Sequence, residues 1–353
     1  MWSRNSLTER LSLKWPILQA PMGGLSTPTL AAAVSNAGGL GALSMLGFTD
    51  EDAERFIAAF RQQSTGALNV NYPLWPEPKI TAKASEAMRK HLQPLYDANR
   101  LGSVPQPQGA ASEITSDRMA MLLRAKPEVV SFHFGLPSSD VMNAIKGTGT
   151  FVICSATTVA EARILEDRGV DAIIAQGTEA GGHRGTFTGV DMSQQAGLLA
   201  LLPQVVDAVK VPVIAAGGVA DSRQIAAAFM LGASAVQMGT AFLRCDEANA
   251  PAAYVAALRD ANDASTIVTD MITGRPARYI RNKLTADLIA SGIEAVAFPA
   301  QMSLTAPLGA TGDKEMTVLF AGQSAALAKD TDVASLIESL GQETTHKLRT
   351  FLD

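Results

Sequence analysis

The sequence predicts an α/β protein built as a closed (β/α)₈ barrel of the TIM type, with an insertion after the third strand and a helical C-terminal extension. Eight short apolar runs alternate with segments of helical periodicity, which is typical of a parallel sheet with crossover helices. Runs such as 172–176 (AIIAQ) and 213–216 (VIAA) show no polar alternation, as expected for strands that are buried on both faces. Eight such units favour a closed barrel over an open doubly wound sheet.

The first β/α units follow this pattern closely. A strand at 16–20 ends at a Pro-Met-Gly-Gly run, and Ser26 or Thr27 can cap the next helix, whose first turn holds Pro28. The glycines at 38–39 end that helix. The elements that follow are a strand at 40–44, a helix at 51–63 and a strand at 67–71.

Residues 72 to about 117 interrupt the alternation. They contain several prolines, a helix-like piece at 81–97 and a loose run at 102–112 (GSVPQPQGAAS). Proline cannot donate a hydrogen bond within a central strand, so this segment adds no strand to the barrel. We interpret it as an insertion at the end of the third strand, without a core of its own.

The alternation then resumes and runs to residue 238. The expected helices are 117–126, 138–146, 158–168, 193–209 and 222–231, and the expected strands are 129–133, 151–154, 172–176, 211–216 and 234–238. After Leu243 the pattern is helical and irregular as far as Asp353. We therefore expect residues 1–245 to form the barrel and residues 246–353 to form a helical extension that packs on it.

The bulk properties exclude several functional classes. A net charge of −5 over 353 residues argues against a nucleic-acid-binding protein, which usually carries a basic patch. Cys154 and Cys245 lie in apolar runs without metal-binding or redox spacing, so we expect buried thiols in a reducing compartment and no metal site. The N-terminus lacks a signal-peptide pattern and no run approaches the ~18 apolar residues of a membrane span, so we expect a cytoplasmic protein.

Two glycine turns predict a phosphate site. Gly217 and Gly218 follow the seventh strand, and Gly239 and Thr240 follow the eighth. In barrels these two loops commonly hold a phosphate through backbone N–H groups, which a Cβ atom would obstruct. Glycine also makes tight turns without any ligand, but its presence after both strands favours the phosphate interpretation.

A second set of residues could hold a planar ring. Gln19, Asn69 and Gln176 stand at the ends of three different strands, and amides can donate to and accept from a uracil-like edge. Met22 could lie beneath such a ring as an adaptable apolar surface. Any one of these amides is more simply explained as a strand-end side chain that is hydrogen-bonded within the protein. Only the three together, at the ends of different strands, indicate that a ring is bound.

Two histidines are the candidate catalytic residues. His183 lies in the glycine-flanked loop that follows the sixth strand, and His133 ends the fourth strand. Imidazole is the commonest general base, and a partly solvated loop would leave the pKa of His183 near neutrality. A lone histidine is more often structural, but both of these stand where barrel enzymes place their chemistry. Glu179 could pair with Arg184 or contact a substrate, and a salt bridge to Arg184 within the loop is the simpler expectation.

Five motifs together resemble the nitronate monooxygenase family, formerly called 2-nitropropane dioxygenases. They are QAPMGG (19–24), NAGGLG (36–41), AQGTEAGGHRG (175–185), PVIAAGGV (212–219) and AVQMGTAFL (235–243). The segment VSFHFGLP (130–137) is similar to class I, bacterial members. The resemblance implies a flavin mononucleotide (FMN)-dependent barrel enzyme that uses O₂ to oxidise small alkyl nitronates, and as a further class nitroalkanes, to a carbonyl compound and nitrite. His183 matches the family's catalytic histidine.

The resemblance also implies a set of FMN contacts. They are Ala20, Pro21, Met22, Asn69, Gln176, Gly181, Gly182, Gly217, Gly218, Gln237, Met238, Gly239 and Thr240. A C-terminal Gly322-Gln323 pair resembles an element that approaches the flavin in the family. Relatives carry extra tyrosines around the substrate, whereas residues 296–309 contain none, which leaves the substrate open.

Two alternatives remain open at this stage. FMN-dependent NAD(P)H:quinone reductases and enoyl-acyl-carrier-protein reductases share this fold and much of the phosphate motif. A non-catalytic protein that binds a flavin or phosphate ligand is the other alternative, against which the two histidines at strand ends argue. The oligomeric state is also open.

Overall fold

Eight parallel strands form a nearly closed barrel in the computed structural model, which describes residues 2–189 and 191–350. Around the barrel the strand order is β1-β9-β8-β6-β5-β4-β3-β2. A bridge between Leu18 and Leu40 joins β1 to β2 and brings the two ends of that order together. The predicted (β/α)₈ fold is confirmed. The barrel strands are β1 (Ile17–Gln19), β2 (Gly41–Ser44), β3 (Leu68–Pro73), β4 (Val129–His133), β5 (Phe151–Ala156), β6 (Ala172–Gln176), β8 (Val213–Ala216) and β9 (Ala235–Met238).

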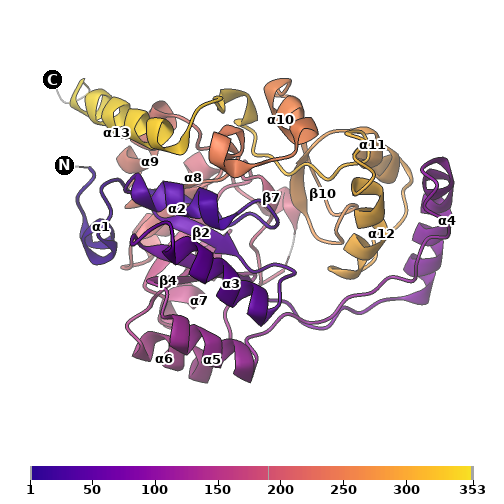
Figure 1. The fold of residues 1–353 in the computed structure, drawn as a ribbon, viewed down its shortest axis with the longest axis horizontal. Helices are drawn as coiled ribbons and strands as arrows, with labels where there is room; N and C mark the ends of the chain where they lie inside the picture. The colour runs from indigo at the N-terminus through magenta and orange to yellow at the C-terminus, as the bar shows by residue number, and fades with distance from the viewer. Residues whose placement is uncertain (1, 190, 351–353) are drawn as a thin grey trace.

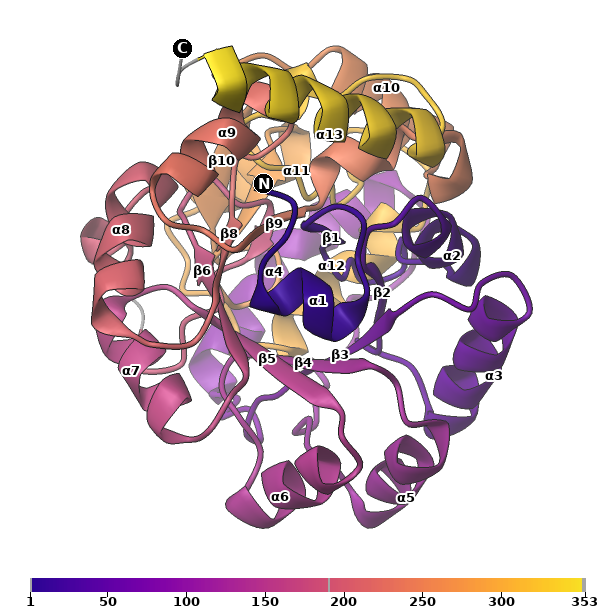
Figure 2. The same ribbon diagram turned by 90° about the vertical axis from the view of Figure 1, so that its left-hand side faces the viewer.

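Helices surround the strands, and Figure 2 shows this ring with the short helix α1 (Ser6–Leu11) across the near end of the barrel. The Thr27 hydroxyl caps α2 with Pro28 at its first position, as the sequence predicts. The outer helices are α2 (Pro28–Asn36), α3 (Asp50–Arg61), α5 (Ser116–Ala125), α6 (Ser139–Gly147), α7 (Val159–Asp167), α8 (Leu198–Ala208) and α9 (Ser222–Met230).

Helix α8 begins five residues later than the sequence suggests. Asp191 caps a short 3₁₀ turn, η1 (Met192–Gln194), after which the chain is extended. The helix starts only where the Glu179 carboxylate accepts the backbone N–H of Leu198 (2.8 Å). The start of α8 therefore depends on a side chain from another loop, which local patterns do not reveal.

A second, three-stranded antiparallel sheet was not predicted. It joins β7 (Gly182–His183) to β11 (Ala277–Ile280), which also pairs with β10 (Thr266–Thr269). The expectation that the chain is only helical and irregular after Leu243 is wrong here. Strands of two to four residues are too short for periodicity to identify.

A second hydrophobic core joins the insertion to the C-terminal region. Helix α4 (Ala82–Ala98) of the insertion packs against α11 (Lys283–Ala290) and α12 (Ala300–Gly309). The Tyr96 hydroxyl donates to the Leu304 carbonyl (2.8 Å) within this core. The insertion thus shares a core with the C-terminal part, which sequence reasoning missed. Figure 1 shows these helices at the end of the molecule opposite α1, so they cover the carboxyl ends of the barrel strands.

The remaining C-terminal elements complete the barrel's outer layer. Helix α13 (Val333–Thr350) packs mainly against α9 and α2. The other elements are η2 (Thr240–Arg244), η3 (Asp246–Ala248), α10 (Ala252–Arg259) and η4 (Ala325–Leu327). Cys154 and Cys245 are free and buried, as predicted.

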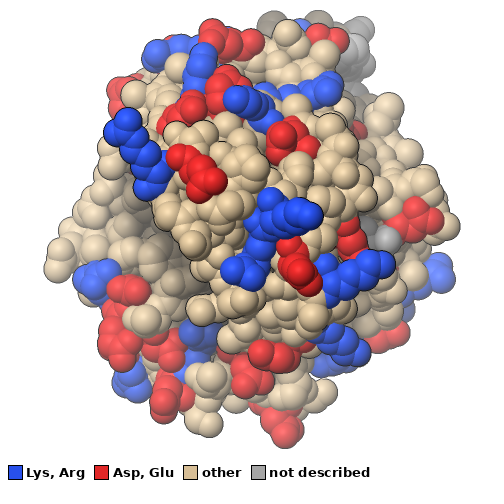
Figure 3. Space-filling view, turned by 90° about the vertical axis from the view of Figure 1, so that its right-hand side faces the viewer, with Lys and Arg blue, Asp and Glu red and all other residues tan. Residues whose placement is uncertain are grey.

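Acidic and basic side chains are interspersed over the face that carries α4, α11 and α12 (Figure 3). Within the described ranges, no helix is long and apolar enough to span a membrane. Residues 2–189 and 191–350 contain no cluster of three or more His, Cys, Asp or Glu side chains that could hold a metal ion.

Candidate active site

His183 stands on the short strand β7, not in a flexible loop as the sequence suggested. Its backbone pairs with Ala277 of β11, so the second sheet holds it above the carboxyl ends of the barrel strands. Gly182, the other residue of β7, has φ = +74°, a conformation that L side chains rarely adopt. Glycine is therefore required for this two-residue strand to leave β6 and meet β11.

The hydrogen bonds of Thr273 determine which ring nitrogen of His183 carries a proton. The Thr273 hydroxyl lies 2.9 Å from His183 Nε2 and 3.1 Å from both the Arg275 carbonyl and the Tyr279 hydroxyl. A carbonyl can only accept, so Thr273 satisfies all three contacts only by donating to Arg275 and accepting from Nε2–H and from Tyr279. This assignment leaves His183 Nδ1 unprotonated and able to accept a proton.

Aromatic rings enclose His183. Its ring centroid lies 5.2 Å from that of Phe298, 5.4 Å from Phe320 and 5.9 Å from Phe134. Trp75 contacts Phe298 in turn, with centroids 5.0 Å apart. We call these four residues the aromatic enclosure. Trp75 belongs to the insertion and Phe298 and Phe320 to the C-terminal part, so distant segments meet around one histidine.

The pKa of His183 is lowered to about 3, chiefly by burial and further by His133 and the Arg275 guanidinium. This corrects the near-neutral pKa expected for a solvated loop. Arg275 lies across the Phe134 ring, with its guanidinium carbon 3.9 Å from the ring centroid. Burial also lowers the pKa of Arg275 to about 10, so the guanidinium stays charged at neutral pH while His183 is neutral.

His133 is fully occupied by protein contacts. Its Nδ1 is hydrogen-bonded to the Ser155 hydroxyl, and its Nε2 lies 3.3 Å from the backbone carbonyl of His183. That carbonyl can only accept, so Nε2 carries the proton and Nδ1 accepts from Ser155. Burial lowers the pKa of His133 to about 3. The catalytic role predicted for His133 stays a prediction, and its contacts suit a residue that positions His183.

Gln176 also holds the chain around His183. Its amide nitrogen donates to the His183 carbonyl (3.0 Å) and its amide oxygen accepts the Gly185 N–H (2.8 Å). A Cβ atom on Gly185 would lie 2.7 Å from His133 Cε1, so glycine allows this close approach. The side-chain amide of Gln176 is therefore engaged within the protein.

Two other amides among the predicted FMN contacts, one of them from the ring-binding set, have buried oxygens without partners. Asn69 Oδ1, at the second position of β3, and Gln237 Oε1, near the end of β9, accept no hydrogen bond from the described residues. Gln19, by contrast, accepts the Ala42 N–H and donates to Ser26. An unpaired buried oxygen is costly, so Asn69 and Gln237 are the amides best suited to receive a ligand's N–H group.

The predicted phosphate turns depend on glycine. Gly217 has φ = +117° and Gly218 has φ = +67°. A Cβ atom on Gly218 would lie 2.9 Å from Glu179 Cβ, so the turn after β8 is packed directly beneath the loop after β6. At the rim of the barrel mouth, the Ala20 N–H donates to the Met238 carbonyl (2.7 Å), which joins the ends of the neighbouring strands β1 and β9.

The C-terminal segment 321–324 lies against these turns. The Gly322 N–H donates to the Thr240 hydroxyl (3.0 Å), and the Ser324 hydroxyl donates to the Gly218 carbonyl (2.7 Å). The backbone of Gly322 comes so close to Gly181 that a Cβ atom there would lie 2.6 Å from its nitrogen. The structure thus brings together the glycines that follow β6, β8 and β9.

The pairing expected between Glu179 and Arg184 does not form. Glu179 caps α8, and the buried Arg184 donates to the carbonyls of Gln176 and Gly177 and to the Gln195 side chain. The carbonyl groups at the end of β6 accept from Arg184, while the Glu179 carboxylate accepts the N–H at the start of α8. Arg184 is therefore part of the framework under β7.

Sequence reasoning missed Thr273, Arg275 and Phe298. All three lie in the part of the chain that was expected to be helical, and no local motif marks them. They reach His183 only because β11 pairs with β7. Only the pairing of β7 with β11, which links residues about 90 positions apart, could have identified these three residues.

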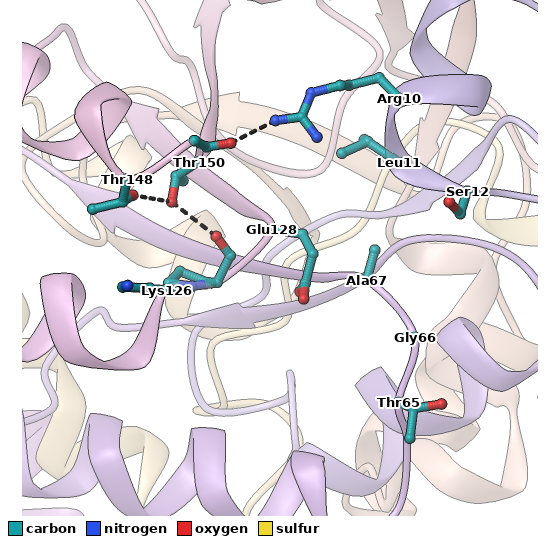
Figure 4. Close-up of a pocket in the computed structure, with 12 residues that line it drawn as sticks. Arg10, Leu11, Ser12, Thr65, Gly66, Ala67, Lys126, Glu128, Thr148 and Thr150 are labelled. Carbon is teal, nitrogen blue, oxygen red and sulfur yellow. Dashed lines mark hydrogen bonds between the residues drawn. The ribbon is translucent and has the colours of Figure 1, made fainter.

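A cavity of about 350 Å³ lies at the other end of the barrel and is a separate feature (Figure 4). It is lined by Arg10 of α1 and by residues that precede β3, β4 and β5, including Glu128, whose carboxylate accepts from Arg61 (2.6 Å). Thr148 and Thr150 hydrogen-bond to each other at its edge (2.9 Å). The amino-terminal face of a barrel serves stability, whereas chemistry takes place at the carboxyl ends of the strands.

Known proteins of one family match this chain over almost its whole length. A family model described as nitronate monooxygenase matches residues 4–343. A nitronate monooxygenase of Pseudomonas aeruginosa is 39% identical over 345 residues, which cover 95% of this chain and 98% of the relative. A solved nitroalkane oxidase from Streptomyces ansochromogenes has a TM-score of 0.91 at 38% identity and covers 99% of this chain and 100% of its own. FabK from Thermotoga maritima has a TM-score of 0.78 at 30% identity, with 99% and 98% of the two chains covered.

Proposed function

Because the chain belongs to the nitronate monooxygenase family, we propose that this oxidoreductase binds FMN and uses O₂ to convert alkyl nitronates, and nitroalkanes as a further class, to a carbonyl compound and nitrite. The observation that carries the proposal is His183. It is neutral, its Nδ1 is free to accept a proton, and it stands above the strand ends that carry the glycine turns.

The residues at the barrel mouth fit FMN. The unpartnered oxygen of either Asn69 or Gln237 can accept from the single N–H group of an oxidised isoalloxazine ring, which would relieve one of these two buried, unsatisfied groups. Gly217, Gly218 and Gly239 would offer backbone N–H groups to the phosphate. When bound, FMN would supply the electron acceptor for the nitronate and the centre that reacts with O₂.

His183 would take the proton from the carbon next to a nitro group. Nδ1 is the acceptor, because Nε2–H is held by Thr273. The imidazolium that forms is disfavoured by burial and by Arg275, but the nitronate anion formed beside it carries the opposite charge and stabilises it. For a substrate that arrives as a nitronate, His183 has no proton to remove and would serve only to position it.

The test is the substitution His183→Asn. We expect FMN to remain bound and turnover of a neutral nitroalkane to fall by about 10²–10⁴-fold, with a smaller loss for the nitronate. His346→Asn, on the exposed face of α13, is the matched control and should leave both rates unchanged. Nitroalkane kinetics unaltered by His183→Asn would remove this histidine from the mechanism.

An NAD(P)H-dependent quinone or enoyl-acyl-carrier-protein reductase is the second candidate, and the likeness to FabK supports testing it. Anaerobic mixing of the flavin-loaded protein with propionate 3-nitronate and, separately, with NADH and NADPH distinguishes the two. We expect the nitronate to bleach the flavin spectrum. Rapid bleaching by NADH or NADPH but not by the nitronate would select the reductase, and a protein that cannot be loaded with FMN would defeat both.

A further inference from the structure

A second cavity, of about 400 Å³, lies between helix α7 and the two segments that follow β4 and β7. Residues 134–136 form one wall, residues of α7 and its C-cap form the second, and residues 187–188 form the third. Small-molecule sites in proteins span roughly 300–1,000 Å³, so this cavity is large enough for a ligand of its own. In the described part of the chain its lining includes Phe134 and not His183, so the cavity is distinct from the candidate active site.

The walls of this cavity are mostly apolar. Leu136 and Leu165 line it together with the rings of Phe134 and Phe187. Ile164 completes the apolar lining, and 41% of its surface is exposed. An apolar ligand would remove this surface from water, which is the gain that drives the binding of apolar groups. The lining therefore favours a ligand with an apolar body.

The walls are held in place by the protein itself. The backbone N–H groups of Phe187 (2.7 Å) and Thr188 (3.2 Å) both donate to the buried carboxylate of Glu161. The wall after β4 turns at Gly135, whose φ of +113° favours glycine. A Cβ atom there would lie 3.5 Å from Phe187 Cβ, so these two walls are in contact. A cavity that is already formed lowers the entropy cost of binding.

Arg168 supplies a positive charge to the cavity. Its Nη2 donates to the Pro137 carbonyl (2.7 Å), and within residues 2–189 and 191–350 it takes part in no ion pair. The Glu166 carboxylate of the same helix accepts the backbone N–H groups of Lys210 and Val211 instead. The remaining guanidinium N–H groups of Arg168 are therefore available to a ligand, and a planar carboxylate fits the guanidinium fork.

We propose that this cavity binds a small carboxylic acid with an apolar aromatic or branched body. The carboxylate pairs with Arg168, and the body covers Ile164 and Phe187. Phe134 lines the cavity and also contacts His183, with ring centroids 5.9 Å apart, so an occupied cavity acts on the candidate active site through this ring. Binding of the acid does not depend on the proposed function, whereas its effect on turnover rests on it.

Three probes test the binding site by titration calorimetry of the purified protein. 3-Phenylpropionate carries both the acid and the apolar body, 3-phenylpropionamide lacks the charge, and acetate lacks the body. We expect the Kd of 3-phenylpropionate to be about tenfold or more below that of the amide, and acetate not to bind at millimolar concentration. Equal Kd values for the acid and the amide, or no binding of the acid at millimolar concentration, would overturn the proposal.

Matched variants locate the binding in this cavity. Ile164→Trp fills the cavity from an exposed position and should abolish binding of the acid. Arg168→Met should raise the Kd of the acid about tenfold and leave that of the amide unchanged. Leu199→Trp, at a 73% exposed position of α8, is the control and should bind the acid as the parent protein does. A melting curve checks that each variant is folded. Binding that neither cavity variant weakens would place the acid elsewhere and contradict the proposal.

Steady-state kinetics separate the cavity from the active site. An acid bound beside His183 would compete with a nitronate and raise its apparent KM. From the cavity, 3-phenylpropionate should change kcat by about twofold or more at unchanged KM, and Ile164→Trp should abolish this response. A rise in apparent KM alone would overturn the proposal, and unchanged kcat and KM with the acid bound would overturn the link through Phe134.

The two proposals fail in different ways. A protein that binds 3-phenylpropionate through Arg168 but turns over no nitronate would refute the proposed function and retain the cavity site. Turnover of nitronates without binding of the acid would do the reverse.

Discussion

The hydroxyl group of Thr273 determines which ring nitrogen of His183 carries a proton. It accepts from His183 Nε2–H and from Tyr279 while it donates to the Arg275 carbonyl. Valine has the same shape but cannot accept, so it would remove the preference for the Nε2–H tautomer. Serine keeps the hydroxyl and loses only a methyl group.

We therefore predict that Thr273→Val lowers kcat for nitroalkanes by about 10–100-fold at unchanged FMN affinity, and that Thr273→Ser restores most of the rate. The rate falls because His183 no longer keeps Nδ1 unprotonated in every molecule, so the base is only partly available. Nitrogen-15 NMR of the His183 ring should show one tautomer in the parent protein and a mixture in the valine variant. An unchanged nitrogen spectrum in Thr273→Val would contradict the tautomer assignment. The buried Tyr279 hydroxyl also loses its partner, so a melting curve accompanies each variant.

At the scale of the elements, helix α7 holds the chain that follows β7. Glu161 stands in its first turn and is fully buried. Hydrogen bonds from Thr157, Thr186 and the backbone of Phe187 lower its pKa despite burial, so it is ionised in the folded protein. The Glu161 carboxylate thereby fixes the loop that contains Thr186, whose backbone carbonyl accepts a hydrogen bond from Arg275.

Glu161→Gln should lower the free energy of unfolding by about 2–4 kcal/mol, because an amide nitrogen cannot accept the hydrogen bonds that this position receives. Urea unfolding followed by circular dichroism measures the change. Glu54→Gln removes an exposed carboxylate that pairs with Arg124 and should change the stability by less than about 1 kcal/mol. Equal effects of the two variants would show that Glu161 does not anchor the loop.

The sequence identifies the barrel elements because their signals are local. Runs such as 172–176 are apolar throughout since both faces are buried, and Thr27 with Pro28 marks a helix start without any tertiary contact. The second sheet is different, because the two residues of β7 become a strand only through β11. His183 was therefore found by its motif, while Thr273 and Phe298 could not be found before the pairing was known.

At the scale of the whole molecule, the two half-buried histidines, His133 and His183, make the fold sensitive to acid. The pKa of each is lowered to about 3 in the folded state, against an ordinary value of about 6.5 when unfolded. Above pH 6.5 both states carry neutral imidazoles and the histidines have no effect. Between pH 6.5 and 3 the unfolded chain binds protons that the folded chain does not, so stability falls as the pH falls.

We predict that the free energy of unfolding decreases over this window by up to about 1.4 kcal/mol per pH unit for each histidine. Glu161 adds a loss of the same sign as it becomes protonated, so the comparison must be between variants. His133→Asn and His183→Asn should each have a shallower slope between pH 6 and 4 than the parent protein. Slopes identical to that of the parent would mean that the histidines are solvated and titrate normally.

The aromatic enclosure also has a consequence for the order of events during synthesis. The barrel strands are complete at Met238, whereas Phe298 and Phe320 follow about 60 and 80 residues later. At a ribosomal rate of ~5–20 residues per second, the barrel precedes its cover by roughly 3–16 s. Throughout that interval Trp75 and Phe134 lack the partners that shield them, and the nascent chain presents an uncovered apolar mouth that only its own C-terminal region can close.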